Sequence, residues 1–292
     1  MAQIRIAGIM RAGDYSPNHI GNDAAIFNGV AEQLRRRGCE VELMSEEEFK
    51  KRTPDQPIII NMCREKDSVK KLQELEDTGR IVINSGYGIE NCTRERMTLI
   101  MAGNSLPTPD SLIVNTNEKV MDDLTEKKIG ACWVKRGDYH SKHKEDVTYC
   151  RHPEEAQEVL HEFFYRGIKR AVINRHLVGD LIKFYGVVGT PFFHWLYTRD
   201  EPVMTSSGNP NSPIVAKIPF DPKTLEEICI RTAETLDVKI FGGDCIIEPD
   251  GQIRIIDFND WPSFAPCRKE ASVHIAKAII NAANEKMRGI KK

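Results

Sequence analysis

Residues 241–262, FGGDCIIEPDGQIRIIDFNDWP, constrain the fold of this chain more than any other stretch. Two apolar, strand-like runs flank an Asp-Gly pair, which is a strong signal for a two-residue β-hairpin loop. If this pair forms the loop, Asp244 lies directly opposite Asp257, and Asn259 lies on the same face as Asp257 because the strand period is two. The sequence therefore predicts three oxygen-bearing side chains side by side on one face of a hairpin.

Two directly opposed carboxylates repel each other and destabilise a sheet, so this arrangement is favourable mainly when a cation lies between them. Asp244, Asp257 and Asn259 offer hard oxygen ligands without His or Cys. Such ligands favour Mg²⁺, with Mn²⁺ as the alternative, over Zn²⁺. Each residue alone is commonly structural, and only their common face predicts a metal site. Mg²⁺ on so few protein oxygens usually shares its shell with nucleotide phosphates.

The first hundred residues alternate strand-like apolar runs with amphipathic helical segments. This alternation is typical of a parallel sheet with crossover helices. Ligands of such sheets bind beyond the carboxyl ends of the strands, which places Arg11, in the polar loop 10–22, beside a substrate. We expect strands over 3–9, 39–43, 57–61 and 80–84 and helices over 22–38 and 67–79, the first capped by Asn22 or Asp23 and ended by Gly38.

Beyond Leu106 to Asp110, where Pro-Thr-Pro interrupts the chain, the pattern changes to antiparallel hairpins mixed with helices. We therefore expect an N-terminal α/β domain over 1–106 and an α+β domain over 107–292, divided into subdomains 107–176 and 177–292. The expected strands are 131–135, 146–150, 171–175 and two within 181–198, and the expected helices are 153–167 and 221–237.

The composition excludes several classes of protein. With 40% hydrophobic and 29% charged residues and a formal net charge of −2, the chain is neither disordered nor collagen-like. It has no apolar run of membrane-spanning length, no signal peptide and no Lys/Arg-rich tract, so we expect a cytoplasmic protein without a membrane or nucleic-acid partner. The eight cysteines lack zinc-site spacing, which predicts reduced, buried thiols. A homodimer is left open.

The order of these features resembles the ATP-grasp superfamily. The resemblance covers most of the chain and rests on NSGYGIENCTRERMTLIMAGNSLPTPDSLIV, a strand ending in Lys135, the segment INRHLVGD, and GxDxI…DG…IDxNxxP. The last motif is highly specific, whereas the others are individually weak. The resemblance implies an ATP-grasp fold, in which an N-terminal parallel α/β domain precedes two α+β subdomains that enclose ATP.

The resemblance also implies roles for individual residues. Asp244, Asp257 and Asn259 would bind the Mg²⁺ that bridges the phosphates, the same three residues that the hairpin predicts. The loop after Lys135 departs from the family because it carries His and Lys in place of glycines. The remaining implied contacts are Lys135 with phosphate, the backbone of Arg175, His176 and Leu177 with adenine, Asp180 with ribose, and Lys183 with the reacting groups. In place of the glycines, the cationic side chains of the loop 136–144, His140 among them, would neutralise phosphate.

The acceptor of the phosphoryl group decides the reaction. A carboxylate acceptor would give an acyl phosphate that an amine or thiol then attacks, and Arg11 would receive such a carboxylate. A hydroxyl acceptor would make the protein a kinase, and FGGD with IDFNDWP also resembles the inositol-phosphate kinase branch. A non-catalytic nucleotide-binding module is the third alternative, although intact Lys135, Asp244, Asp257 and Asn259 argue against it. We favour a ligase acting on a small molecule.

Overall fold

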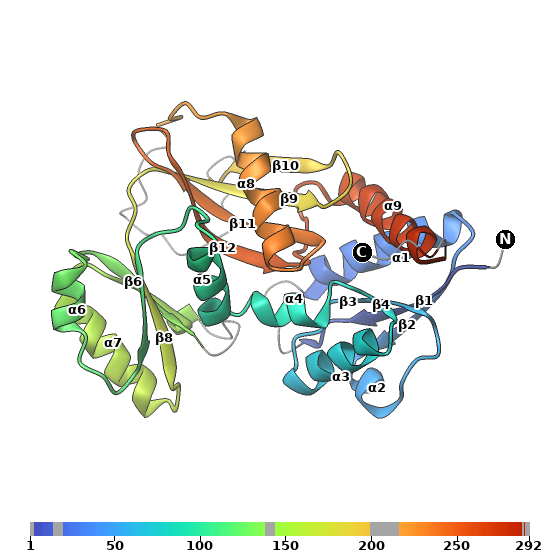
Figure 1. Cartoon of the computed structure of the whole chain (residues 1–292), viewed down its shortest axis with the longest axis horizontal. Helices are drawn as coiled ribbons and strands as arrows, with labels where there is room; N and C mark the ends of the chain where they lie inside the picture. Colours follow the sequence, from blue (N-terminus) through green and yellow to red (C-terminus); the bar gives the residue numbers. More distant parts are fainter. Residues whose placement is uncertain (1–2, 14–19, 138–143, 199–215, 288, 290–292) are drawn as a thin grey trace.

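The computed structural model describes residues 3–13, 20–137, 144–198, 216–287 and 289, which form three four-stranded sheets with helices packed on them (Figure 1). The N-terminal sheet is parallel, as predicted, with the strand order β2-β1-β3-β4. Its strands are β1 (Arg5–Met10), β2 (Glu40–Ser45), β3 (Ile58–Asn61) and β4 (Ile81–Ile83), and its helices are α1 (Ile20–Arg36), α2 (Glu46–Lys51) and α3 (Lys66–Asp77).

The ends of α1 test the predicted helix signals. Gly38 follows its last turn with a φ of +84°, a conformation that favours glycine, and so acts as the expected stop signal. The predicted start is wrong, because α1 begins at Ile20 rather than after Asn22 or Asp23. Asp23 lies instead in the first turn, where it forms an ion pair with Arg11.

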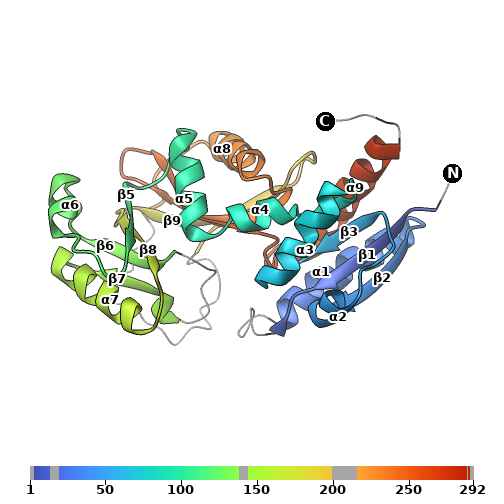
Figure 2. The same cartoon turned by 60° about the horizontal axis from the view of Figure 1, so that its bottom comes forward.

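The helices α4 (Gly86–Asn91) and α5 (Arg94–Gly103) lead from the first sheet to the second (Figure 2). The second sheet is antiparallel with the order β5-β8-β6-β7. Its buried residues pack against α6 and α7 to form a separate core. The elements are β5 (Ser111–Asn115), α6 (Met121–Glu126), β6 (Cys132–Arg136), β7 (Val147–Cys150), α7 (Pro153–Tyr165) and β8 (Arg170–Arg175).

The third sheet is antiparallel with the order β10-β9-β11-β12. Its aromatic core, which includes Phe184, Phe241 and Phe258, packs against α8. The C-terminal helix α9 returns to the N-terminal sheet, where Trp261 and Phe27 share a core with it. The elements are β9 (Asp180–Val187), β10 (Phe193–Tyr197), α8 (Pro222–Thr235), β11 (Ile240–Ile247), β12 (Ile253–Asp260) and α9 (Arg268–Met287).

Two further predictions concern the cysteines and the length of the helices. All eight cysteines are free and buried. No helix in the described ranges is both long enough and apolar enough to cross a membrane.

Candidate active site

The loop between β11 and β12 is longer than predicted. The strand ladder closes with a hydrogen bond from Glu248 N to Gln252 O (2.9 Å), so residues 249–251 form a three-residue loop rather than a two-residue one. Gly251 has a φ of +82°, as the last position of such a loop requires. The two-residue loop expected from the Asp-Gly pair is therefore wrong.

A β-bulge nevertheless brings the two acids together. Continued from the loop, the pairing would put Asp244 opposite Ile256, but the register shifts by one residue and Asp244 pairs with Asp257. Ile256 is the extra residue on β12, and such a residue is left out of the strand ladder. The Lys135 Nζ donates to the carbonyl oxygen of Ile256 over 3.2 Å. The bulge thus sets both the position of the acids and that of the lysine.

Gly243 allows the strands to come this close. A Cβ at this position would lie 2.2 Å from the Asp257 carbonyl oxygen and 2.7 Å from the Phe184 ring. We expect Gly243→Ala to lower the free energy of unfolding by about 1–3 kcal/mol, the range of an overpacked core. Denaturation in urea would measure it. Gly130→Ala is the control, since nothing lies within 4 Å of its new Cβ. Equal midpoints for the two variants would contradict the prediction.

Three cations surround the acid pair. Lys183 pairs with Asp244 across β9 and β11, and its Nζ lies 3.3 Å from Asp244 Oδ1. Arg94, at the start of α5, places Nη1 3.6 Å from Asp257 Oδ1. Lys135 completes the set. Arg94 is the residue that sequence reasoning missed, although a cation in the first turn of a helix opposes the helix dipole and is itself a signal.

The two acids have pKa shifts of opposite direction. Burial raises the pKa of Asp244, and the charge of Asp257 acts in the same direction. Burial also opposes ionisation of Asp257, but the charges of Arg94 and Lys135, with a hydrogen bond from Asn259 (3.2 Å), outweigh it and lower the pKa of Asp257. Asp257 is therefore the better-stabilised anion of the pair.

Lys135 is held in an environment that disfavours its charge. Burial lowers the pKa of Lys135 to about 7, and the charge of Arg94 acts in the same direction, against Asp257 and Asp244. The side chain is almost fully buried. An anionic ligand such as a phosphate would further stabilise the charged form of this side chain.

The carboxylate oxygens of the acid pair have acceptor capacity left for a metal ion. Asp244 Oδ1 is buried, and its contact with Lys183 Nζ over 3.3 Å is an ion pair that leaves acceptor capacity for a cation. Within the described part of the chain, no three His, Cys, Asp or Glu side chains cluster as a metal site. Asp244, Asp257 and Asn259 therefore fit Mg²⁺ only as a partial shell, which phosphate oxygens or water would complete.

The predicted adenine-binding segment connects the second sheet to the third. His176 N donates to Ala131 O (2.9 Å), and its Nδ1 accepts from Trp133 Nε1 (3.1 Å), which fixes this ring nitrogen as an acceptor. Burial lowers the pKa of His176, so its ring is neutral at neutral pH. Arg175 Nη2 lies 3.3 Å from Asp110, and Leu177 is buried. Contacts of this segment with adenine stay a prediction.

One other predicted residue, Asp180, has partners within the chain, and a second is not described. Both carboxylate oxygens of Asp180 accept backbone hydrogen bonds, from Ala216 and Ile218, each over 2.7 Å. This geometry accounts for Asp180 without a ribose, and the ribose contact stays a prediction. His140 lies outside the described residues.

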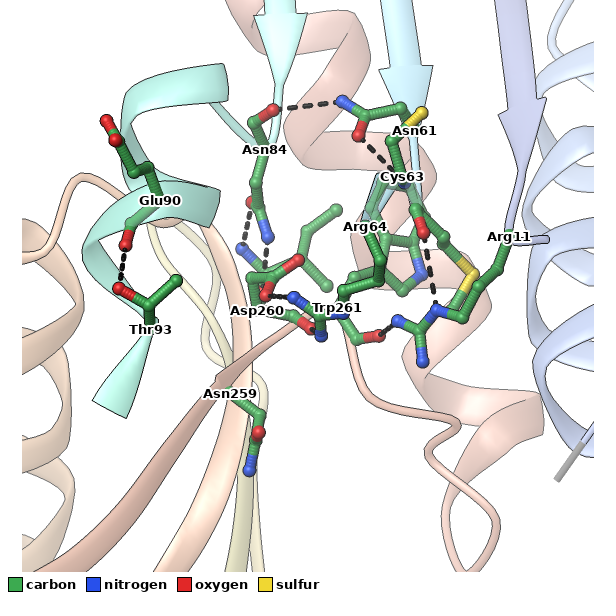
Figure 3. A network of polar contacts seen from close by, with 12 residues as sticks. Arg11, Asn61, Cys63, Arg64, Asn84, Glu90, Thr93, Asn259, Asp260 and Trp261 are labelled. Atoms are coloured by element: carbon green, nitrogen blue, oxygen red, sulfur yellow. Dashed lines mark hydrogen bonds and ion pairs between the residues drawn. The ribbon is translucent and has the colours of Figure 1, made fainter. Parts of the chain in front are cut away.

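Arg11 joins the N-terminal sheet to the end of β12 (Figure 3). Its guanidinium donates to Asp23 (3.0 Å), to Met62 O (3.3 Å) and to Trp261 O (3.1 Å). Beside it, buried Arg64 forms an ion pair with Asp260. Arg11 therefore acts as a clamp between the N-terminal domain and the end of β12, and its contact with the acceptor carboxylate stays a prediction.

The clamp is connected to the acid site through β12. Asp260 and Trp261 directly follow Asn259, whose side chain points away from Asp260 in Figure 3. The clamp thus fixes the end of the strand that carries Asp257 and Asn259. Arg64 and Asp260 were not predicted as a pair, and only the folded chain brings them together.

Comparison with known proteins identifies the fold. No protein-family model and no curated protein matches the sequence. D-alanine–D-alanine ligase from Bacillus anthracis, solved with ATP, superposes with a TM-score of 0.68 at 12% identity, over 98% of this chain and 100% of the ligase. D-alanyl-alanine synthetase A from Vibrio cholerae O1 biovar eltor gives a TM-score of 0.68 at 10% identity, over 96% and 98% of the two chains.

A third similar structure is the ATP-grasp ligase PsnB, solved with the precursor peptide PsnA2 and AMPPNP. It superposes with a TM-score of 0.62 at 14% identity, over 96% of this chain and 97% of PsnB. All three likenesses extend over almost the whole chain and include all three sheets. The resemblance found in the sequence is confirmed at the level of the fold, and the chain has the fold of the ATP-grasp ligases.

Proposed function

We propose that this protein is an ATP-dependent ligase that activates a carboxylate and joins it to an amine or a thiol. One observation carries the proposal: Asp244 and Asp257 oppose each other across a bulge, with Lys135, Lys183 and Arg94 around them. This arrangement of acids and cations suits a metal-bound triphosphate, and it occurs in a chain with the fold of the ATP-grasp ligases. We also propose that the protein is cytoplasmic and exists as a monomer or a homodimer.

ATP would lie between the second and third sheets. Asp244, Asp257 and Asn259 would hold Mg²⁺, or Mn²⁺ in its place, and the metal would neutralise charge on the phosphates. Lys135 and Arg94 would bind phosphate oxygens as cations. Lys183 would stay close to the transferred group through its pairing with Asp244.

The reaction needs no covalent enzyme nucleophile. An oxygen of the acceptor carboxylate attacks the γ-phosphorus, the bond to the bridging β–γ oxygen breaks, and ADP leaves. The amine nitrogen, or thiol sulfur, then attacks the acyl carbon, phosphate leaves with the C–O electron pair, and the nucleophile loses its proton to solvent. The three cations stabilise negative charge that moves onto ADP and phosphate during these steps.

Trapping with hydroxylamine tests this proposal. The full chain would be incubated with Mg-ATP, pools of carboxylic acids and hydroxylamine, and hydroxamate and ADP would be measured. A ligase releases ADP and hydroxamate in equal amounts with an effective acid, because hydroxylamine attacks the acyl phosphate.

The alternatives give different products. A kinase, the inositol-phosphate type included, would release ADP with pooled polyols or inositol phosphates and form a stable phosphomonoester without hydroxamate. A non-catalytic nucleotide-binding module would release no ADP with any pool. Asp257→Asn protein is the background control in each assay.

A further inference from the structure

Arg170, the first residue of β8, joins the second sheet to the start of α5. Its guanidinium donates three hydrogen bonds to the Glu95 carboxylate, over 3.1, 3.1 and 2.7 Å, through Nε and Nη2. A fourth hydrogen bond, over 2.7 Å to Asn115 Oδ1 of β5, holds the guanidinium from the side of its own sheet. A forked contact between guanidinium and carboxylate fixes the orientation of both groups. Arg170 therefore holds Glu95, and with it the first turn of α5, in a defined position.

Backbone contacts join the same elements. Glu95 N donates to Gly137 O over 3.2 Å, and Gly137 N donates to Arg170 O over 2.9 Å. Further along α5, Met97 and Met101 pack in the core that the third sheet shares with α8. The helix is thus anchored to the third sheet by its apolar side chains and to the second sheet by its first turn. A change at Arg170 should loosen that first turn without removing the backbone contacts or the core.

The first turn of α5 carries a cation of the acid site. Successive residues of an α-helix point about 100° apart, so Glu95 can face the second sheet while Arg94 faces the third. Arg94 Nη1 lies 3.6 Å from Asp257 Oδ1, which is longer than a hydrogen bond. This ion pair alone therefore fixes the Arg94 guanidinium only weakly, and its position depends on how the first turn is held.

We infer that Arg170 and Glu95 are positioning residues for the reaction, which hold the Arg94 guanidinium beside the acid pair. The inference rests on the proposed function, in which Arg94 binds a phosphate oxygen of ATP. Neither Arg170 nor Glu95 needs to touch the nucleotide, because both act through the first turn of α5. That turn connects the two sheets between which we place ATP, so the arrangement of Arg94 and Asp257 depends on both sheets.

Calorimetric titration of the full chain with Mg-AMPPNP tests this inference without turnover. We expect Arg170→Met and Glu95→Gln each to weaken binding about five- to tenfold, which is part of the contribution of one hydrogen bond to a charged group. Arg254→Met is the matched control and should bind like the parent. Its ion pair with Glu248 has side-chain exposures of 30% and 21%, against 31% and 22% for the pair of Arg170. Parent-like affinity in both test variants overturns the inference.

A change at Arg94 distinguishes positioning from a general effect on the fold. Arg94→Met alone should weaken binding at least as much as Arg170→Met does. If Arg170 acts through Arg94, adding Arg170→Met to Arg94→Met should cause no further loss, because residues that act through one contact are not additive. Parent-like affinity of Arg94→Met, or a full further loss in the double variant, overturns the inference.

The hydroxamate assay keeps this inference separate from the ligase. Hydroxamate formed by the parent, together with parent-like nucleotide affinity of Arg170→Met and Glu95→Gln, would contradict the positioning role and not the ligase. Weakened nucleotide binding in these variants, without hydroxamate from the parent, would contradict the ligase and not the positioning role. A parent that does not bind Mg-AMPPNP would overturn both.

Discussion

Replacing Asp257 by asparagine should reduce Mg²⁺-dependent ATP turnover by at least about a hundredfold, because partners outside the metal's own shell already contribute 10- to 100-fold and a ligand contributes more. The amide keeps the size of the side chain and removes its charge. Release of ADP with an effective acid would measure the loss. Asp250→Asn is the matched control, because Asp250 lies in the loop of the same hairpin, where its side chain accepts from Gln252 N (3.0 Å).

The same two acids should differ in their effect on stability. Asp257 has a lowered pKa, so its charge stabilises the fold above the carboxyl's unfolded pKa, and that contribution is lost as the pH falls through the lowered value. Asp244 has a raised pKa, so its charge destabilises the fold at neutral pH. Without Mg²⁺ at pH 7, Asp257→Asn should lower the Tm and Asp244→Asn should raise it, while both variants lose Mg²⁺-dependent turnover to a similar extent.

Repulsion between the opposed carboxylates alone would predict a different pair of Tm changes for the two variants. If repulsion dominated, removal of either acid would raise the Tm. Arg94 and Lys135 change that expectation because they lie on the side of Asp257. A rise in Tm for both variants would therefore show that the cations around Asp257 do not stabilise it, and turnover that survives in Asp257→Asn would remove the site.

The hairpin shows how far the sequence could predict the candidate site. The pairing of Asp244 with Asp257 was predicted and is confirmed, but the loop from which it was predicted has a different length. The Asp-Gly pair indicated a two-residue loop, the fold uses three residues, and the bulge at Ile256 restores the pairing. A bulge depends on what approaches the strand from elsewhere, here Lys135 from the second sheet, and no local pattern reports it.

Other features could not be predicted because they depend on contacts between distant parts of the chain. The helix α9 was not predicted, although Ala271, Ile275 and Ile279 recur at helical spacing; this spacing does not reveal that the face they form packs against the N-terminal domain. The clamp between Arg11 and Trp261 joins residues 250 positions apart. By contrast, the parallel sheet was predictable because its strands are short, apolar and regularly spaced along the chain.

Replacing Lys135 by methionine should weaken binding of Mg-AMPPNP by about 10- to 100-fold, the contribution of one hydrogen bond to a charged group. Methionine fills a similar volume without the ammonium. Calorimetric titration of the full chain would measure the affinity. Lys169→Met is the control, since Lys169 is an exposed lysine of the same subdomain. Equal affinities in the two variants would contradict a phosphate contact for Lys135.

The same variant should gain stability, with a defined dependence on pH. Burial lowers the pKa of Lys135 to about 7, well below the value of 10.5 that it has when exposed. Between these values the unfolded chain binds more protons than the folded one, so the stability of the parent protein rises with pH over that window. Lys135→Met should therefore exceed the parent in Tm most at pH 7 and below, and this advantage should disappear toward pH 10. A loss of Tm at pH 7 would mean that Asp244 and Asp257 already compensate the charge of Lys135. In that case this lysine stabilises the fold and is not kept for binding a phosphate.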